Sequence, residues 1–463
     1  MPLPSTHACE DCLLLVYTDI RTGPRILFGA VLSSFLIVDC VIAYMLEEME
    51  MEDKNPNNLQ DLSSLRISSL EEEEVEVEED DYEDDEEEEE EDDDEDEVSV
   101  ALGFVEKPKN PRLLLRHLFP SKAGGVPAWL DPVNLPSEKS RVCGFCGEPL
   151  QFLLQVYAPI SEKESTFHRM LFVFMCTSMA CLLQDQHEQW KRRPETQCRS
   201  VKVFRCQLPR SNPFYSSEPP RHDGTDKPSG DGAALCCWCG TWKGEKVCGS
   251  CKKARYCSEK HQVMHWRSAH KVECRQICAT FQTSDSSHNQ RTLPLMVSSK
   301  TLWPEYEIVS EDECSFDTEA SEASDDKSSL VSKAEVDEMF KSLLDKFEGN
   351  DDQRSWASFQ GRIAKAPEQV LRYCRDVKAK PLWPMSSGRP SNADIPKCSY
   401  CGGPLCFEFQ VLPQLLYYFG VKNDIDSLDW ATIVAYTCMA SCEASVSYKE
   451  EFVWVQLSSS SPI

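Results

Sequence analysis

The sequence has few of the short motifs on which catalysis and nucleotide binding depend. Only 19 of its 463 residues are glycine, and we find no glycine-rich loop for a phosphate or cofactor, no G-x-S-x-G and no methyltransferase motif. Three histidines stand alone, His117, His168 and His187, and their surroundings suit surface or packing positions better than a catalytic base. These absences argue against an enzyme.

Positive charge is also scarce. The chain has 48 Lys and Arg against 78 Asp and Glu, and its longest basic cluster is the short Lys191–Arg193. Direct binding of nucleic acid is therefore not expected. Of the net charge of −30, the run Glu71–Glu97 supplies 24 carboxylates in 27 residues, so the rest of the chain carries about −6. Such a run stays disordered. It is either a solvating tail or a polyanion that keeps a basic partner soluble and competes with RNA for it.

Long apolar runs are limited to one, Ile26–Leu46, with a single charge at Asp39. Twenty-one residues are enough to span a bilayer. However, Asp39 costs roughly 2.5–3.5 kcal/mol there, and the flanking charges would send the thiols that follow into an oxidising lumen. The run is either a membrane anchor or a non-functional extension. We expect residues 1–97 to be dispensable and the protein to be soluble rather than bound to a membrane.

Cysteine, in contrast, is abundant. Eleven of the 24 cysteines fall into C-x2-C and H-x3-C spacings, which in a long chain indicate zinc in a reducing compartment, here the cytoplasm and the nucleus. An isolated pair, Cys9 and Cys12, has no partner pair nearby. One stretch stands out, with eight ligand candidates in under forty residues: Cys236, Cys239, Cys248, Cys251, Cys257, His261, His270 and Cys274. Because one Zn²⁺ takes four ligands, this stretch predicts two zinc ions.

The order of these pairs resembles the MYND zinc finger, and the residues Ala254–Ser258 and His265–His270 add to the likeness. Spacing alone does not decide between sequential and interleaved pairing. The resemblance implies interleaving, with Cys236, Cys239, Cys257 and His261 on one ion and Cys248, Cys251, His270 and Cys274 on the other. MYND fingers are protein-interaction modules, and so short a segment depends on its metal to fold.

A second type of zinc site precedes the finger. The pair Cys143 and Cys146 is followed by two apolar strands, Phe152–Tyr157 and Leu171–Met175, and the second strand leads into Cys176 and Cys181. Metal ligands at strand ends are typical of a zinc ribbon, so we predict a third ion at Cys143, Cys146, Cys176 and Cys181. Cys198 is an alternative fourth ligand, because the polar stretch Gln184–Gln197 interrupts the pattern and has the character of an insertion.

The same pattern returns after the finger. Residues 398–411 match residues 143–156 at a constant offset of 255, and a strand at Thr432–Thr437 leads into two further cysteines. We therefore predict a fourth ion at Cys398, Cys401, Cys438 and Cys442. The expected fold is α+β and mostly β: a composite domain of two repeated zinc-ribbon-like units, with the finger inserted between them and disordered acidic segments outside.

Smaller elements complete the expected fold. We expect an edge strand within Leu302–Val309, a capped helix carrying Val336–Leu344, a helix with Phe359 and Ile363, a helix starting at Pro367, and a last strand around Glu450–Trp454. The predicted domains are 1–97, an acidic extension; 98–232, the first half; 233–278, the finger; 279–350, a linker; and 351–463, the second half.

Three further segments carry a family resemblance: the loop Phe119–Leu130, the segment Pro367–Tyr373 and the end Glu450–Trp454. Together with the finger, they are similar to the programmed cell death protein 2 family over roughly Val98–Gln456. The resemblance implies a chaperone for one newly made small-subunit ribosomal protein, the one at the mRNA entry channel, and so a role in small-subunit biogenesis. The loop around Trp129, with Trp129 as its apolar anchor, is a candidate source of apolar contacts with this client. The alternative is a MYND transcriptional co-regulator that binds proline-containing peptides.

Overall fold

The structure is a computed structural model that describes residues 17–19, 23–25, 98–136, 139–192, 198–221, 232–282, 302–316, 351–422, 424 and 426–458. The chain divides into two compact units, Met1–Glu97 and Val98–Ile463. In the first unit, strands β1 (Tyr17–Asp19) and β2 (Gly23–Arg25) form an antiparallel pair.

Several expected features lie outside the described residues. They are the pair Cys9 and Cys12, the apolar run Ile26–Leu46, the acidic run Glu71–Glu97 and the helix carrying Val336–Leu344. Within the described ranges, no helix is both long and apolar enough to cross a bilayer.

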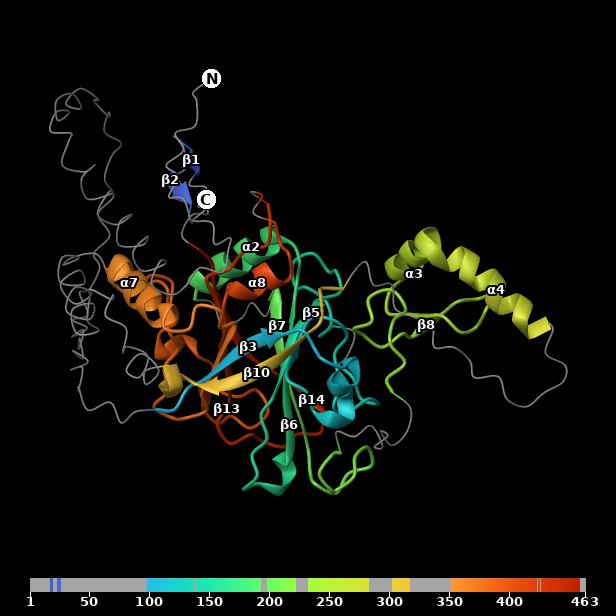
Figure 1. The fold of residues 1–463 in the computed structure, drawn as a ribbon, viewed down its shortest axis with the longest axis horizontal. Helices are drawn as coiled ribbons and strands as arrows, with labels where there is room; N and C mark the ends of the chain where they lie inside the picture. Colours follow the sequence, from blue (N-terminus) through green and yellow to red (C-terminus); the bar gives the residue numbers. More distant parts are fainter. Residues whose placement is uncertain are drawn as a thin grey trace, which may run out of the picture. The chain divides into compact units, whose positions relative to one another are not determined.

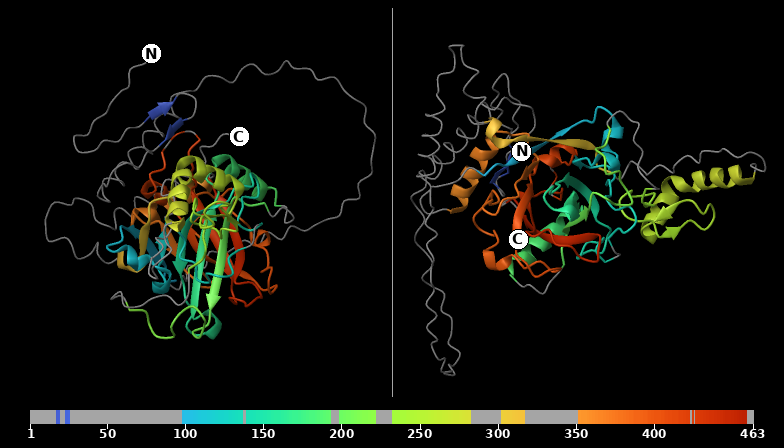
Figure 2. Two further views of the ribbon diagram at one scale, coloured as in Figure 1. Left: turned by 90° about the vertical axis from the view of Figure 1, so that its right-hand side faces the viewer. Right: turned by 90° about the horizontal axis from the view of Figure 1, so that it is seen from below.

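The second unit is mostly β and is built on a closed, antiparallel barrel of ten strands. In order around the barrel these are β10 (Tyr306–Asp312), β3 (Ala101–Glu106), β11 (Leu371–Tyr373), β12 (Leu405–Val411), β13 (Thr432–Cys438), β14 (Tyr448–Gln456), β7 (Val201–Leu208), β6 (His168–Met175), β5 (Gln151–Tyr157) and β4 (Lys122–Ala123). Figures 1 and 2 show the green strands of the first half and the red strands of the second half in this one barrel. The strands expected at Phe152–Tyr157, Leu171–Met175, Thr432–Thr437 and Glu450–Trp454 are all present.

Each half contributes three consecutive strands, and the two sets join along one seam. The first set is β5–β6–β7 and the second is β12–β13–β14. At the seam β7 pairs with β14, with Val203 opposite Glu451 and Cys206 opposite Tyr448. Both sets also contain an irregularity in register at the same place, between Phe152 and Leu154 and between Phe407 and Phe409, which are 255 residues apart.

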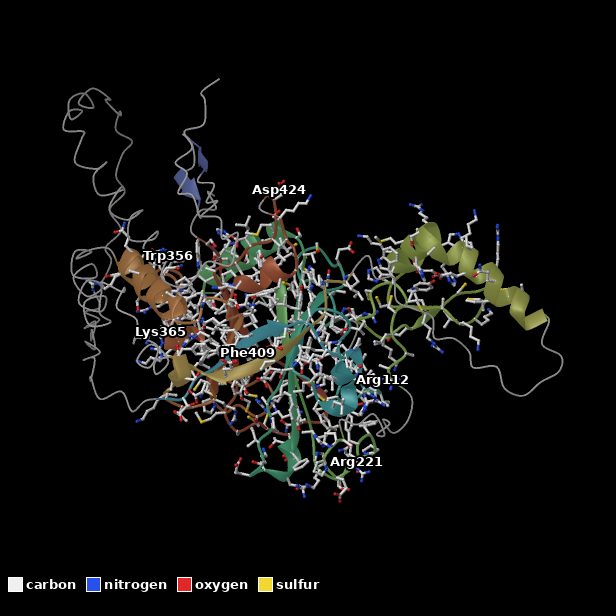
Figure 3. The ribbon with its side chains drawn as sticks, in the orientation of Figure 1. Arg112, Arg221, Trp356, Lys365, Phe409 and Asp424 are labelled. Carbon is white, nitrogen blue, oxygen red and sulfur yellow. The ribbon has the colours of Figure 1, made fainter. Side chains whose placement is uncertain are left out.

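Strands β5, β6 and β13 are buried on both faces, which explains their largely apolar sequences. On β6, Leu171 and Val173 point into the aliphatic core of the barrel, and the alternate residues Phe172 and Phe174 pack outside it. Phe409 on β12 belongs to the inner core, is fully buried, and lies among the strands in Figure 3.

The first part of the polar stretch after Cys181, Gln184–Trp190, belongs to a helix. Helix α2 (Met179–Trp190) buries Gln186 and Gln189 against β14 beyond the point where β7 stops pairing with it. Gln189 accepts from Val455 N at 3.0 Å and donates to Val455 O at 2.9 Å, and Gln186 accepts from Leu457 N at 2.7 Å. These side chains are polar because they complete the hydrogen bonds of a strand edge.

Two sequence-based expectations are wrong. The helix expected from Pro367 is replaced by β11, because Val370 donates to Gly103 O at 2.8 Å and its own carbonyl accepts from Leu412 N at 2.9 Å. Pairing with distant strands thus overrides the local helix signal. The strand after Pro304 is not an edge strand, because β10 pairs with β3 on one side and with β4 on the other.

The remaining helices are short and lie outside the barrel sheet. The expected helix with Phe359 and Ile363 is confirmed as α7 (Asp351–Ala364), and both residues are buried. The others are α8 (Gln414–Tyr418) and the 3-10 turns η1 (Pro111–Leu114), η2 (Arg116–Leu118), η3 (Glu164–Thr166) and η6 (Asn392–Asp394).

Candidate metal centres

Four C-x2-C turns share one backbone conformation. In each, the carbonyl of the first cysteine accepts the N–H of the residue four positions later, at 2.8–3.1 Å, and that residue is left-handed. The turns begin at Cys143, Cys236, Cys248 and Cys398, and the left-handed residues are Gly147, Gly240, Lys252 and Gly402. The conformation reverses the chain within one turn, so both sulfurs point to the same side.

In the first half, the turn is completed by two cysteines that follow β6. The structure groups the sulfurs of Cys143, Cys146, Cys176 and Cys181 within 4.8 Å of one another. Cys176 directly follows β6, and Cys181 lies in the first turn of α2. Cys198 is exposed and lies outside this group, with its backbone against Gly144 instead. Of the two alternatives, the geometry thus brings in Cys181.

The second half repeats this arrangement. The sulfurs of Cys398, Cys401, Cys438 and Cys442 are also within 4.8 Å of one another, and Cys438 ends β13 as Cys176 follows β6. In both groups the second cysteine of the turn, Cys146 or Cys401, is exposed, and the other three are buried.

The finger holds two groups that interleave along the chain. They are Cys236, Cys239, Cys257 and His261, and Cys248, Cys251, His270 and Cys274. The finger consists of β8 (Lys246–Val247) and β9 (Arg255–Tyr256), then α3 (Glu259–His265), a π-helical turn η4 (Trp266–His270) and α4 (Lys271–Gln282), drawn as consecutive coils in Figure 1. The Ser258 hydroxyl accepts from His261 N at 3.1 Å, which fixes the start of α3 beside the first group.

The spacing of the donor atoms fits a tetrahedral zinc ion. Four sulfurs bound to one ion at about 2.3 Å lie about 3.8 Å apart. The Sγ atoms of Cys146 and Cys176 are 3.7 Å apart, and those of Cys401 and Cys438 are 3.6 Å apart. In the finger, Cys251 Sγ lies 3.5 Å from His270 Nε2. A disulfide needs about 2.05 Å, so these pairs are not disulfides.

The electrostatics of the groups also call for a cation. A hydrogen bond from Cys176 lowers the pKa of Cys143 to about 5, and the same contact raises the pKa of Cys176. In the finger, burial opposes protonation of His261, but the sulfurs of Cys236 and Cys239 raise its pKa to about 9. One thiolate therefore forms in each case only by keeping a neighbour protonated. A divalent cation removes this conflict, because coordinated thiols lose their protons.

Glu273, which sequence reasoning missed, lies beside a ligand of the finger. A carboxylate oxygen of Glu273 lies 3.5 Å from Nδ1 of His270 and 3.5 Å from Nε2 of His265. Tyr256 Oη in turn lies 3.1 Å from His265 Nδ1. A carboxylate behind a metal-ligating imidazole orients the ring and raises its basicity. The spacing of three residues between His270 and Glu273 on a helix is the signal that indicates this contact.

The finger is attached to the first half through two tryptophans. Trp129 Nε1 donates to Thr241 O at 2.9 Å, and Trp242 Nε1 donates to Leu150 O at 2.7 Å. The ring of Phe174 packs against both tryptophans, with its centroid 5.3 Å from that of Trp129 and 4.5 Å from that of Trp242. Trp129 is only 2% exposed, so this side chain anchors its loop inside the protein, as the sequence predicts.

Three family models match separate parts of the chain. Residues 99–222 match the N-terminal domain of programmed cell death protein 2, residues 353–457 its C-terminal putative domain, and residues 236–274 the MYND finger. The finger and the clusters together indicate zinc binding.

Curated relatives cover most of the chain. Programmed cell death protein 2 of Rattus norvegicus is 39% identical over 365 residues, which is 78% of this chain and 96% of the rat protein. The Bos taurus protein of the same name is 39% identical over 362 residues, with coverage of 77% and 95%. Programmed cell death protein 2-like of Homo sapiens is 27% identical over 341 residues, with coverage of 70% and 85%. No solved structure matches the chain significantly.

Proposed function

Because the chain belongs to the programmed cell death protein 2 family, we propose that it is a zinc-dependent chaperone or adaptor for a newly made, basic ribosomal protein of the small subunit. The proposed client is the protein at the mRNA entry channel, and its delivery supports assembly of the small subunit. The family is not a known enzyme family, and the proposal requires no catalytic group. It includes no direct contact with nucleic acid or membrane.

The proposal includes four zinc ions: two in the finger and one in each of two repeated zinc-ribbon-like units. Support for the repeat comes from the two turns, where Gly147 N donates to Cys143 O at 3.0 Å and Gly402 N donates to Cys398 O at 2.8 Å. The matching register irregularities in β5–β6 and β12–β13 add to it. Thiolate ligands persist in a reducing compartment, so we place the protein in the cytoplasm and the nucleus.

One observation carries the chaperone proposal: the residues directly after the first acidic stretch are hydrogen-bonded to the start of the second. The run Glu71–Glu97 ends immediately before Val98, and the second stretch covers Ser310–Asp326. Ser99 Oγ donates to Asp312 Oδ2 at 2.9 Å, and Glu313 N donates to Val100 O at 2.9 Å. Two acidic stretches that meet the barrel at neighbouring residues raise the local concentration of a basic client. They also screen the charge with which the client binds RNA.

The test is co-expression of the client with three chains: the intact chain, a variant lacking Cys236–Cys274, and Cys401→Ser. We expect soluble complex with the first two and none with the third. We also expect the electrostatic part of binding to weaken with salt, because exposed charges are screened over about 8–10 Å at physiological ionic strength. Failure of the intact chain to hold any small-subunit ribosomal protein would sink the proposal.

A second candidate function rests on the finger. Val263, Met264 and Trp266 are 46%, 38% and 40% exposed on its helices, which is unusual for such large apolar side chains at neighbouring positions. An adaptor that binds proline-containing peptides would use such a surface. Capture of a proline-containing peptide by the isolated, zinc-loaded finger, without capture of the ribosomal client by the intact chain, would favour this function.

A further inference from the structure

Side chains of the first half, together with Arg375 of the second half, hold the ligand loop of the second half. This loop runs from Met439 to Cys442, between two cysteines of the second group. Lys163 Nζ donates to Ala440 O and to Ser441 O, at 2.9 Å each. From β7, Gln207 Nε2 donates to Ser441 O at 3.2 Å. The position of the loop therefore depends on the fold of a segment more than 200 residues earlier in the chain.

Arg205 on β7 reaches the metal ligands directly. Its guanidinium donates from Nη1 to Cys442 O at 3.2 Å, and Nη2 lies 3.7 Å from Cys442 Sγ. It also pairs with Glu451 on β14, whose other oxygen accepts from Cys438 N at 3.1 Å. Arg205 is fully buried and Glu451 is 8% exposed. One buried ion pair thus contacts two of the four cysteines of the second group.

The first group is supported differently, by residues of its own half. Cys176 N donates to Ser200 O at 2.7 Å, and Gly144 N donates to Arg199 O at 3.0 Å. Both acceptors lie in the segment that leads into β7. Each group is built from its own C-x2-C turn and the end of its own strand. The second group also depends on a cation from the other half.

The chemistry of the site gives this cation a role. One Zn²⁺ and four thiolates carry a formal charge of −2, which is costly to bury without compensation. A guanidinium that donates to a ligand sulfur offsets part of this charge and holds the sulfur in place.

We propose that Arg205 is the outer positioning residue of the second metal centre, so that the second half keeps its ion firmly only when the first half is closed onto it. This inference rests on the proposed zinc sites. It makes the seam between β7 and β14 a coupling between the fold of one half and the metal of the other.

The test compares two buried ion pairs that both join the halves. The double variant Arg205→Met with Glu451→Met removes the pair at the ligands without leaving a lone charge. The control is Arg169→Met with Glu408→Met, a fully buried ion pair across the barrel. This pair is hydrogen-bonded to Thr437 and not to a ligand sulfur. The conservative variant Arg205→Lys keeps the positive charge but loses the planar guanidinium with its several donors. It replaces the first double variant in the test if that variant does not fold.

Two readouts are taken on the intact, zinc-loaded chain. Zinc release to a chromophoric chelator gives the rate for each ion, and alkylation followed by peptide mass spectrometry identifies the cysteines that are freed. In the Arg205 variants we expect one ion of four to leave about 10- to 100-fold faster. Alkylation should appear first at Cys398–Cys442, with Cys143–Cys181 as the internal reference. The control pair should release zinc as the wild type does.

The outcomes separate the inference from the proposal beneath it. A wild-type chain that holds four ions, with equal release in both double variants, overturns the role of Arg205 alone. A wild-type chain whose Cys398–Cys442 group is alkylated at once and holds no ion overturns the second metal centre, and the inference with it.

Discussion

Exchanging the left-handed turn residue offers a sharp test of the metal-centre geometry. Gly147 and Gly402 have φ of 71° and 70°, and a Cβ added at either would meet no atom within 4 Å. Replacement by alanine therefore introduces no clash, and only the backbone opposes it. An L-residue in this region costs about 1–2 kcal/mol. The lower entropy of the unfolded alanine chain offsets about 0.4–1 kcal/mol of that. The expected net loss is about 1 kcal/mol, or about fivefold in zinc retention at the affected site.

The turn that begins at Cys248 predicts a gain in stability instead of a loss when its left-handed residue is exchanged. Lys252 occupies the same position with φ of 56°, so Lys252→Gly should stabilise the finger by up to about 1 kcal/mol. Gly249 in the same turn supplies a matched control, because it has no left-handed φ and an added Cβ there would meet open space. Gly249→Ala should be neutral or slightly stabilising.

The assay for this series is competition for zinc with a chelator, together with thermal unfolding of the loaded protein. We expect weaker zinc retention and lower stability for Gly147→Ala and Gly402→Ala. We expect higher stability for Lys252→Gly and little change for Gly249→Ala. If all three alanine variants retain zinc equally well, the left-handed residue does not determine how the turn presents its sulfurs.

Three further predictions follow from the structure. Cys143→Ser and Cys398→Ser should each unfold the barrel, since metal binding supplies folding energy, and soluble, cooperatively unfolding protein from both would contradict this. Trp242→Ala should cost about 3–5 kcal/mol of the finger's attachment, because the side chain is fully buried. The variant's finger should keep both ions and become sensitive to proteolysis at its junctions, and unchanged proteolysis would count against the attachment. Finally, burial and the charge of Arg210 lower the pKa of His168 to about 4. The unfolded chain, with a pKa of about 6.5, then binds more protons, so stability should fall from pH 6.5 to pH 4 by at most about 3 kcal/mol. The difference between wild type and His168→Asn in urea unfolding at each pH isolates this effect, and a constant difference would refute it.

The ligand turns were accessible from the sequence because their geometry is local. A C-x2-C pair followed by glycine, as at Cys143 and Cys398, encodes its own turn, and the repeat at an offset of 255 located the second copy. The strands that lead into Cys176 and Cys438 were recognisable because they are apolar and short. These parts depend on neighbours within about ten residues.

The missed features depend on partners far along the chain. β11 forms because Val370 and Leu371 meet β3 and β12. The sequence around Pro367 contains no local pattern that would predict these pairings. From the sequence alone, Gln189 has the character of a surface residue. Only the position of β14 shows that it is buried and hydrogen-bonded to a strand. Arg205 is missed for the same reason, since its sulfur partner lies 237 residues later.

The seam between β7 and β14 also constrains how the protein is made. β14 is the last barrel strand in chain order, and it pairs with both β13 and β7. During translation, the first three-strand set emerges long before its partner, with the hydrogen-bonding edge of β7 unfilled while the finger and linker are synthesised. An open edge of this kind pairs readily with other strands, including those of neighbouring nascent chains. The finger and helix α2 both precede β14 in the chain, so both are synthesised before the strand that closes the barrel.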